Sequence, residues 1–174
     1  MNSDNKSLIL KYKDHEEKRD VFVETGTALG ETTLWAARYF TKVYSIEFQE
    51  NNYVSSFQKL WNIDNIKLFW GDSSQRLKDV AWMILEPAVF FLDAHHTNGE
   101  ADIVASSGTC PIMMELGSIF SRPYNNIIFI DDARLFGIEL GWPNISDIED
   151  FSLNNGYKAD IIGDMIIVSR NGVV

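Results

Sequence analysis

Three scarcities exclude several classes of protein for this chain of 174 residues. Cys110 is the single cysteine, so no disulfide can form within the chain, and a reducing compartment such as the cytoplasm is the expected location. No apolar run approaches the roughly 20 residues of a membrane-spanning helix, and the polar start at residues 1–5 is unlike a secretion signal. Basic residues number 15 against 25 acidic residues, and the net charge of -10 disfavours a nucleic-acid backbone or an anionic membrane as partner.

What the chain does contain is typical of one folded domain. An apolar content of 45% with 13% aromatic residues is enough to build a hydrophobic core, and the length suits a single domain. Residues 1–20 are mostly polar and include the charge run 14–20, so we expect a polar lead-in there. The domain itself is then expected to span residues 21–174.

Alternation of strand-like and helix-like segments predicts a mostly parallel sheet covered by helices. Short apolar runs of strand composition occupy residues 21–23, 42–47, 66–70, 88–92 and 126–130. Helical signals follow them: apolar positions 33, 36, 37 and 40, those at 53, 57, 60 and 61, the cap Ser73, Pro111 in a first turn, and the capping-box spacing 146–149. Four tryptophans on or beside these apolar faces are expected to pack inside: Trp35, Trp61, Trp70 and Trp82.

The end of the chain predicts a reversal of direction. Residues 157–162 and 165–169 are strand-like, and only Gly163 and Asp164 lie between them. A two-residue connection of this kind joins antiparallel strands, because a parallel crossover needs a dozen residues or more. The expected fold class is therefore α/β, a Rossmann-like doubly wound sheet of seven strands, mostly parallel, with an antiparallel C-terminal hairpin strand.

Acidic residues follow all five of the predicted parallel strands: Glu24, Glu47, Asp72, Asp93 and the pair Asp131 and Asp132. Ligands of open parallel sheets bind at this edge, beyond the carboxyl ends of the strands. The first acid begins a glycine-spaced turn that ends at Gly30, and a carboxylate there suits a ligand with cationic or hydroxyl groups better than a pyrophosphate. The simpler alternatives are a turn that only closes a strand–helix unit, and an Asp72 that only caps a helix.

These residues resemble a known family. The segment Glu24-Thr-Gly-Thr-Ala-Leu-Gly30, with Glu47, Gly71-Asp72, Asp93 and the terminal hairpin, is similar to class I S-adenosylmethionine-dependent methyltransferases over residues 21–170, although Ala28 replaces the middle glycine of the first motif. The resemblance implies that S-adenosyl-L-methionine is the cofactor. It also implies which residues bind it: Glu24, Thr25, Gly26, Thr27 and Gly30 on the methionine part, Thr32 near its carboxylate, Glu47 on the ribose hydroxyls, Asp72 and Ser73 on the adenine, and Asp93 at the edge of the same site.

A second resemblance concerns a metal. Asp93 followed by Asp131 and Asp132 is similar to the metal triad of catechol-type and macrolide-sugar (macrocin-like) O-methyltransferases, although the catechol pattern has asparagine at the last position. Adjacent strands lie about 4.8 Å apart, so acids that end neighbouring strands can converge on one cation, and an all-oxygen set suits Mg²⁺. Asp93 and Asp131 would then be catalytic. His96 occupies the position of the family's base lysine and is the candidate base.

Structural readings of the same residues stay open. Asp131 and Asp132 can pair with Arg134 or cap a turn, and His95 and His96 can be solvent-facing residues of a lid over residues 94–110. A zinc site of His95, His96 and Cys110 is less favoured. Trp142 can line a substrate pocket or be buried in its loop.

The function expected from the resemblance is O-methylation of a sugar or small-molecule hydroxyl, with Mg²⁺ assistance and closure of the lid. Neither a nucleic acid nor a membrane is expected as partner. Two alternatives are a non-catalytic cofactor-binding module and an NAD-dependent oxidoreductase. The second is disfavoured by Glu24 and by the absence of Gly-x-Gly-x-x-Gly spacing.

Overall fold

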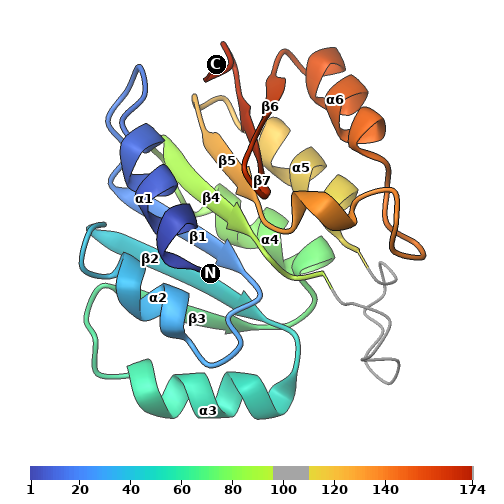
Figure 1. The fold of residues 1–174 in the computed structure, drawn as a ribbon. Helices are drawn as coiled ribbons and strands as arrows, with labels where there is room; N and C mark the ends of the chain where they lie inside the picture. The colour runs from blue at the N-terminus through green and yellow to red at the C-terminus, as the bar shows by residue number, and fades with distance from the viewer. Residues whose placement is uncertain (96–109, 174) are drawn as a thin grey trace.

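A computed structural model describes residues 1–95 and 110–173, which form a seven-stranded sheet with helices on both faces (Figure 1). The strand order is β3-β2-β1-β4-β5-β7-β6. The strands are β1 (Val21–Thr25), β2 (Lys42–Glu47), β3 (Ile66–Trp70), β4 (Ala88–Leu92), β5 (Ile127–Ile130), β6 (Lys158–Ile162) and β7 (Met165–Ser169). The helices are α1 (Ser3–Tyr12), α2 (Glu31–Ala36), α3 (Glu50–Leu60), α4 (Ser73–Trp82), α5 (Ile112–Phe120) and α6 (Ile145–Asn154), with a 3₁₀ turn η1 (Ala133–Leu135).

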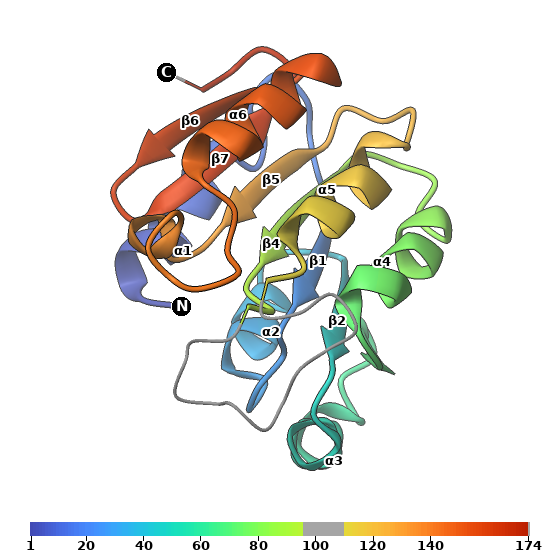
Figure 2. The ribbon, with the colours of Figure 1, turned by 90° about the vertical axis from the view of Figure 1, so that its right-hand side faces the viewer.

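The helices form two layers around the sheet. Helices α4, α5 and α6 lie together on one face, in front of the strands in Figure 2, and close over the larger apolar core. Helices α1 and α2 contribute to a second core on the opposite face. The central strands are fully buried because both of their faces are covered, which explains why β4 is a continuous apolar run, Ala-Val-Phe-Phe-Leu.

The sheet topology confirms the predicted fold class. Strands β1 to β5 pair in parallel, whereas β7 is antiparallel to both β5 and β6. The two-residue link at Gly163 and Asp164 is therefore the hairpin turn, and Gly163 adopts the left-handed φ of 62° that such a turn requires.

The strand register aligns the carboxyl ends of β1, β4 and β5. Thr25 pairs with Leu92, and Leu92 pairs with Ile130. The next residues continue the ladder, since the Asp93 amide donates to the Thr25 carbonyl at 3.1 Å and the Asp131 amide donates to the Leu92 carbonyl at 3.2 Å. Asp93 and Asp131 thus leave the same edge of the sheet side by side.

Several local expectations need correction. The capping box of α6 uses Asn144 and Asp147 rather than Ser146 and Glu149, because the Asp147 carboxylate accepts the Asn144 amide at 2.7 Å. Three of the four tryptophans expected in the core are more than half exposed, at 70%, 53% and 55%: Trp61, Trp70 and Trp82. Trp61 caps the C-terminus of α3, Trp82 is the last residue of α4, and Trp70 ends β3, the edge strand of the sheet. Among the described residues, no helix is long and apolar enough to cross a membrane.

The predicted lead-in over residues 1–20 contains helix α1, which the sequence did not indicate. Asn2 caps its start by accepting the Asn5 amide at 2.9 Å, and Ile9 is 0% exposed within the second core. A helix anchored by one fully buried apolar residue has too weak a pattern to be detected by periodicity. Its position over the end of the sheet nevertheless brings Asn5 to Asp131.

We expect Ile9→Ala to destabilise the whole domain rather than only a terminal segment. Truncation removes a fully buried side chain and leaves a cavity between α1 and the sheet, which costs about 2–5 kcal/mol of unfolding free energy. Urea denaturation measures this loss. Ser7→Ala on the exposed side of α1 is the matched control, and an equal stability of the two variants would show that α1 is not part of the folded core.

Candidate functional site

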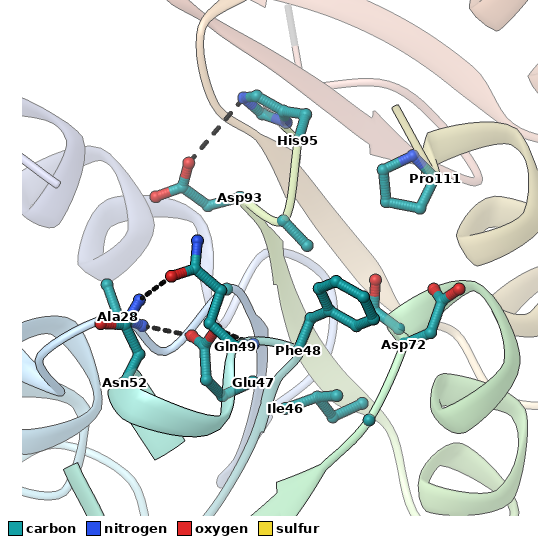
Figure 3. Close-up of a pocket in the computed structure, with 14 residues that line it drawn as sticks. Ala28, Ile46, Glu47, Phe48, Gln49, Asn52, Asp72, Asp93, His95 and Pro111 are labelled. Atoms are coloured by element: carbon teal, nitrogen blue, oxygen red, sulfur yellow. Dashed lines mark hydrogen bonds and ion pairs between the residues drawn. The ribbon is translucent and has the colours of Figure 1, made fainter. Parts of the chain in front are cut away.

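A cavity of about 230 Å³ opens at the carboxyl ends of β1, β2 and β4, where the acids had been predicted to converge (Figure 3). Five of the ten predicted cofactor-binding residues line it: Gly26, Glu47, Asp72, Ser73 and Asp93. The other five, Glu24, Thr25, Thr27, Gly30 and Thr32, are not part of its wall. The remaining lining residues are Ala28, Ile46, Phe48, Gln49, Asn52, Gly71, Ala94, His95 and Pro111.

The glycine turn after β1 is dictated by close packing. Gly26 has a φ of 84°, and a Cβ there would lie 2.1 Å from the backbone oxygen of Asp93, so no other residue fits. Gly30 has a φ of 75°, and its Cβ would lie 2.6 Å from Leu60 Cδ1. Ala28, which replaces the motif's middle glycine, also has a positive φ of 46°.

Glu47 explains how Ala28 tolerates that conformation. The Ala28 amide donates to Glu47 Oε2 at 2.7 Å, and the Gln49 amide donates to Oε1 at 2.7 Å (Figure 3). These two bonds fix the carboxylate at the end of β2 beside the cavity. Glu47 lines the cavity, so its carboxylate places a charged hydrogen-bond acceptor there.

Glu24 lies behind the turn rather than in the cavity wall. Its Oε2 accepts the Thr33 hydroxyl at 2.5 Å and the Ser45 hydroxyl at 2.7 Å, and the residue is 1% exposed. Burial raises the pKa of this carboxyl to about 7. Direct contact of Glu24 with a cofactor stays a prediction. In this structure the Glu24 carboxyl packs behind the turn and is held there by the Thr33 and Ser45 hydroxyls.

Asp72 and Ser73 form the end of the cavity that is suited to a flat base. Asp72 caps α4 by accepting the Ser74 amide at 2.9 Å, so the capping role considered from the sequence is real. Asp72 also lines the cavity, with Phe48 beside it and Pro111 near it (Figure 3). A carboxylate next to apolar surfaces matches a heteroaromatic ring with an exocyclic amine.

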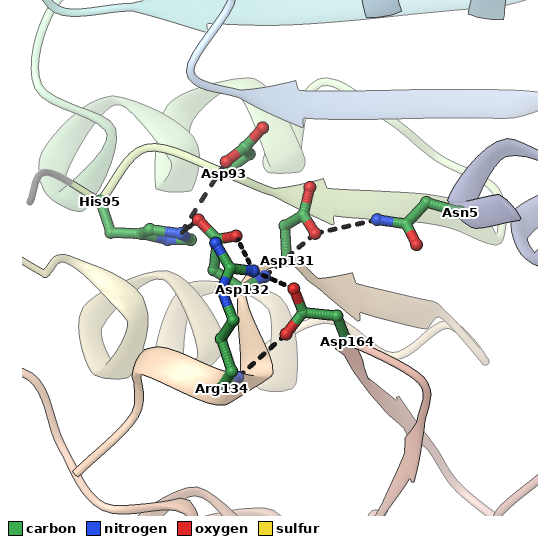
Figure 4. Close-up of polar contacts among 7 residues, drawn as sticks. All are labelled: Asn5, Asp93, His95, Asp131, Asp132, Arg134 and Asp164. Carbon is green, nitrogen blue, oxygen red and sulfur yellow. Dashed lines mark hydrogen bonds and ion pairs between the residues drawn. The ribbon is translucent and has the colours of Figure 1, made fainter. Parts of the chain in front are cut away.

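A second cluster lies at the other end of the cavity, where Asp93, His95 and Asp132 meet (Figure 4). His95 Nε2 lies 3.4 Å from Asp132 Oδ2 and 3.8 Å from Asp93 Oδ1. The His95 side chain is 2% exposed, which corrects the expectation of a solvent-facing residue. Its ring packs edge-on against Trp142, with centroids 4.3 Å apart, and Trp142 is itself buried.

Asp131 is oriented differently from its neighbour. Its Oδ1 accepts the Asn5 side-chain amide at 2.9 Å and the Asp132 backbone amide at 3.0 Å (Figure 4). Asp132 adopts a left-handed φ of 57°, which turns its carboxylate towards His95 and Arg134; Arg134 Nη1 lies 2.7 Å from Asp132 Oδ1 and also pairs with Asp164. The pairing with Arg134 that the sequence left open is therefore present.

The three carboxyls have unequal proton affinities. Burial, followed by repulsion from Asp131, raises the pKa of Asp93 to about 8, and burial also raises the pKa of Asp131. The hydrogen bond with His95 lowers the pKa of Asp132. A cation placed between Asp93 and Asp132 would favour the ionised form of Asp93, against both its burial and the charge of Asp131.

The metal triad of Asp93, Asp131 and Asp132 stays a prediction. In the described part of the chain, the three residues whose ligand atoms lie within 4.8 Å of one another are Asp93, His95 and Asp132. His96, the predicted base, and most of the predicted lid lie outside the described residues.

Comparison with known proteins assigns the fold. No family model matches the chain, and no curated protein sequence matches it. An O-methyltransferase from Bacillus cereus in complex with S-adenosylhomocysteine (SAH) superposes with a TM-score of 0.63 at 19% identity, over 97% of this chain and 80% of that one. A candidate rRNA methylase from Clostridium thermocellum gives 0.64 at 16% identity, over 97% and 96% of the two chains.

A third structure extends the range of substrates on this fold. Magnesium protoporphyrin IX methyltransferase from Synechocystis PCC 6803 with bound SAH gives a TM-score of 0.59 at 13% identity, over 95% and 81% of the two chains. The chain thus has the fold of class I S-adenosylmethionine-dependent methyltransferases, as its motifs predicted. Fold alone does not select a substrate, because these proteins differ in what they methylate.

The buried Glu24 predicts a pH-dependent stability. Its pKa is raised from 4.5 to about 7, so its contribution to stability is fully present below pH 4.5 and is lost as pH rises through 7. The unfolding free energy of Glu24→Gln, taken relative to that of the wild type, should therefore rise by about 2 kcal/mol from pH 5 to pH 8. Urea denaturation at the two pH values measures the gain. Glu31→Gln, at an exposed carboxyl that pairs with Lys59, is the control, and a similar gain there would refute the assignment.

Proposed function

We propose that the protein is an S-adenosylmethionine-dependent methyltransferase that acts on a hydroxyl group of a small molecule or sugar. The observation that carries the proposal is the arrangement of the cavity, in which the fixed Glu47 carboxylate stands between a base-sized slot at Asp72 and a polar cluster at Asp93. These three positions match the ribose, the adenine and the reacting end of an adenosyl cofactor.

The charge of the cavity wall supports a sulfonium cofactor over a dinucleotide. Glu47, Asp72 and Asp93 contribute three carboxyls to one cavity, and the lining includes no lysine or arginine among the described residues. A pyrophosphate would be repelled by this wall, whereas a sulfonium cation would be attracted. An NAD-dependent oxidoreductase is therefore the less favoured function.

Methyl transfer requires the acceptor oxygen to attack the methyl carbon in line with the breaking carbon–sulfur bond. The sulfonium becomes a neutral thioether, and the acceptor proton passes to a base either during the transfer or before it. The cluster of Asp93, His95 and Asp132 lies at the end of the cavity opposite the base slot, where an acceptor would enter. This cluster argues against a binding module without chemistry. We assign Asp93 the role of orienting the acceptor.

The same cluster suits a divalent cation. Asp93, His95 and Asp132 would hold it, and a bound dication would lower the pKa of a coordinated hydroxyl. An imidazole beside two carboxylates favours Mn²⁺ or Zn²⁺ over the Mg²⁺ expected for an all-oxygen triad. Packing of the His95 ring against Trp142 fixes its orientation, and Arg134 holds the Asp132 carboxylate. Asp131 is held by Asn5 and supports the cluster electrostatically.

A small acceptor fits this chain better than RNA, although a candidate rRNA methylase shares the fold. Neutralising phosphates requires lysines and arginines, and the chain has a net charge of -10. His96 as the proton acceptor and closure of the 94–110 segment over the acceptor stay predictions.

Binding of SAH tests the cofactor assignment. We expect calorimetry to show SAH binding to the wild type and no comparable binding of NAD. Glu47→Ala removes a charged acceptor for ligand hydroxyls and should weaken SAH binding by about 10–100-fold. Glu50→Ala, at an exposed carboxyl in the first turn of α3, is the control. Absence of SAH binding to the wild type at millimolar concentration would overturn the proposal.

Cation binding tests which residues form the metal site. Asp93→Asn and His95→Gln should each weaken Mn²⁺ binding by about 10-fold or more in calorimetry, because each removes one of three ligands. Asp131→Asn should weaken it by no more than about 3-fold, since this carboxyl acts only through its charge. Equal losses in Asp131→Asn and Asp93→Asn would restore the all-carboxylate triad, and a wild type that binds no cation would make the cluster structural.

A further inference from the structure

The two edge strands of the sheet differ in how they are protected. Strand β6 at one edge carries two charged residues, and its Asp160 carboxylate accepts the Val173 amide at 2.7 Å, so the end of the described chain lies beside it. Strand β3 at the other edge carries one charged residue, Lys67, whose ammonium group is folded back to 5.9 Å from the centre of the Tyr44 ring. Charges and covering segments keep sheet edges from pairing, so β3 is the edge that can accept another strand.

Alternate backbone groups of β3 point away from the sheet. Just beyond the strand, the Gly71 amide donates to the Glu47 carbonyl at 2.8 Å, so the odd-numbered residues of β3 bond to β2. The residues that direct their amide and carbonyl groups to the open side are Ile66, Leu68 and Trp70. The Ile66 amide donates to the Ile63 carbonyl at 3.0 Å, and no strand of the described chain lies beside the other groups.

An apolar groove accompanies this open side. Figure 1 shows β3 at the edge of the sheet with α3 beside it, and a groove of about 270 Å³ lies between them, lined by Phe57, Trp61 and residues 66–69. Phe57, Trp61 and Trp70 are all exposed, and the Tyr53 ring contacts those of Phe57 and Trp70, with centroids 6.0 and 6.4 Å away. Exposed apolar side chains that gather in one place mark an interaction surface.

The sequence of β3 is complementary to itself in an antiparallel pair. When Leu68 lies opposite Leu68 of the partner subunit, Ile66 lies opposite the partner's Trp70, so apolar side chains meet on the α3 face. On the other face Lys67 lies opposite the partner's Phe69, and no two like charges face each other within the strand. This register pairs all five residues of β3, whereas a register centred on Lys67 would place two ammonium groups opposite each other.

The distribution of charge favours a second copy of the chain at the same surface. Residues 51–70 contain two basic residues, Lys59 and Lys67, and one acidic residue, Asp64, which gives a net charge of +1 in a chain of net charge -10. Two copies of an acidic protein repel each other least where their surfaces lack negative charge. The α3 and β3 surface is therefore the place where two copies can approach at low electrostatic cost.

We propose that two copies of the chain associate through β3, in an antiparallel pair centred on Leu68 at a twofold axis. The Leu68 amide and carbonyl of each copy bond to those of the other, which joins the two sheets into one. Phe57 and Trp61 of both copies then cover the paired strands on the α3 face. The same surface patch serves both copies, as a twofold axis requires. Association of this kind needs neither cofactor nor cation, so it can be measured on the protein alone.

Sedimentation velocity tests the association. The wild type should sediment as a species of twice the chain mass of 19.9 kDa. Trp61→Glu places a charge from each copy in the apolar interface and should weaken association by about 30-fold or more, and it should keep the fold because Trp61 is exposed. Leu153→Glu is the matched control and should associate like the wild type. Leu153 is 67% exposed, against 70% for Trp61, but it lies on α6 beside β6, at the opposite edge of the sheet.

A cysteine cross-link tests the register. Leu68→Cys in a Cys110→Ser background should form a disulfide between two copies when oxidised with diamide, because the Cα atoms of a hydrogen-bonded antiparallel pair lie about 5.5 Å apart. Leu153→Cys in the same background should form no cross-link. A wild type that stays monomeric at about 100 μM would overturn the proposal and leave the edge to a strand of a different protein. A dimer that Trp61→Glu does not weaken, or that Leu68→Cys does not cross-link, would also overturn it, since the copies would then meet elsewhere.

Discussion

The site depends on one steric contact, the approach of the Gly26 turn to the backbone of Asp93. A side chain at Gly26 would collide with the Asp93 carbonyl, and the Gly26 amide donates to the Ile46 carbonyl at 2.9 Å on the other side. The turn therefore touches the strands on both sides of β1. Because the turn keeps the ends of β2 and β4 aligned, Glu47 and Asp93 line one cavity instead of lying apart on the surface.

The last two residues of β1 link that cavity to two buried carboxyls, one on each face of the sheet. Successive side chains of a strand point to opposite faces, so Glu24 meets Thr33 and Ser45 on one face while Thr25 meets Glu115 on the other. Both carboxyls have a pKa of about 7, against 4.5 for an ordinary glutamate. Buried acids of this kind reduce stability at neutral pH.

The fold could be predicted from the sequence because its signals are local. The runs 42–47, 66–70 and 88–92 are strands with the bounds expected, and the Gly163-Asp164 link is the predicted hairpin. The positions of the acids at the strand ends could be predicted from those strand bounds alone. Helix α1 escaped prediction because its stability comes from the contacts of Ile9 with the sheet, which no spacing within residues 1–20 can reveal.

The orientation of the side chains at the site could not be predicted either, because it depends on contacts between residues far apart in the chain. An extended chain alternates its side chains, so Asp131 and Asp132 cannot both face one cation unless the backbone turns. The turn occurs at Asp132, with its φ of 57°, and directs only that carboxylate to His95, while Asp131 bonds to Asn5 from the opposite end of the chain.

His95 completes the cluster because Trp142 and Phe136, far along the chain, bury its ring. An imidazole fixed by two aromatic neighbours loses little freedom when it binds a cation or accepts a proton, whereas a solvent-exposed imidazole would lose much more. The packing of these rings therefore supports the proposed role of His95 as a nitrogen ligand at the acceptor end of the cavity.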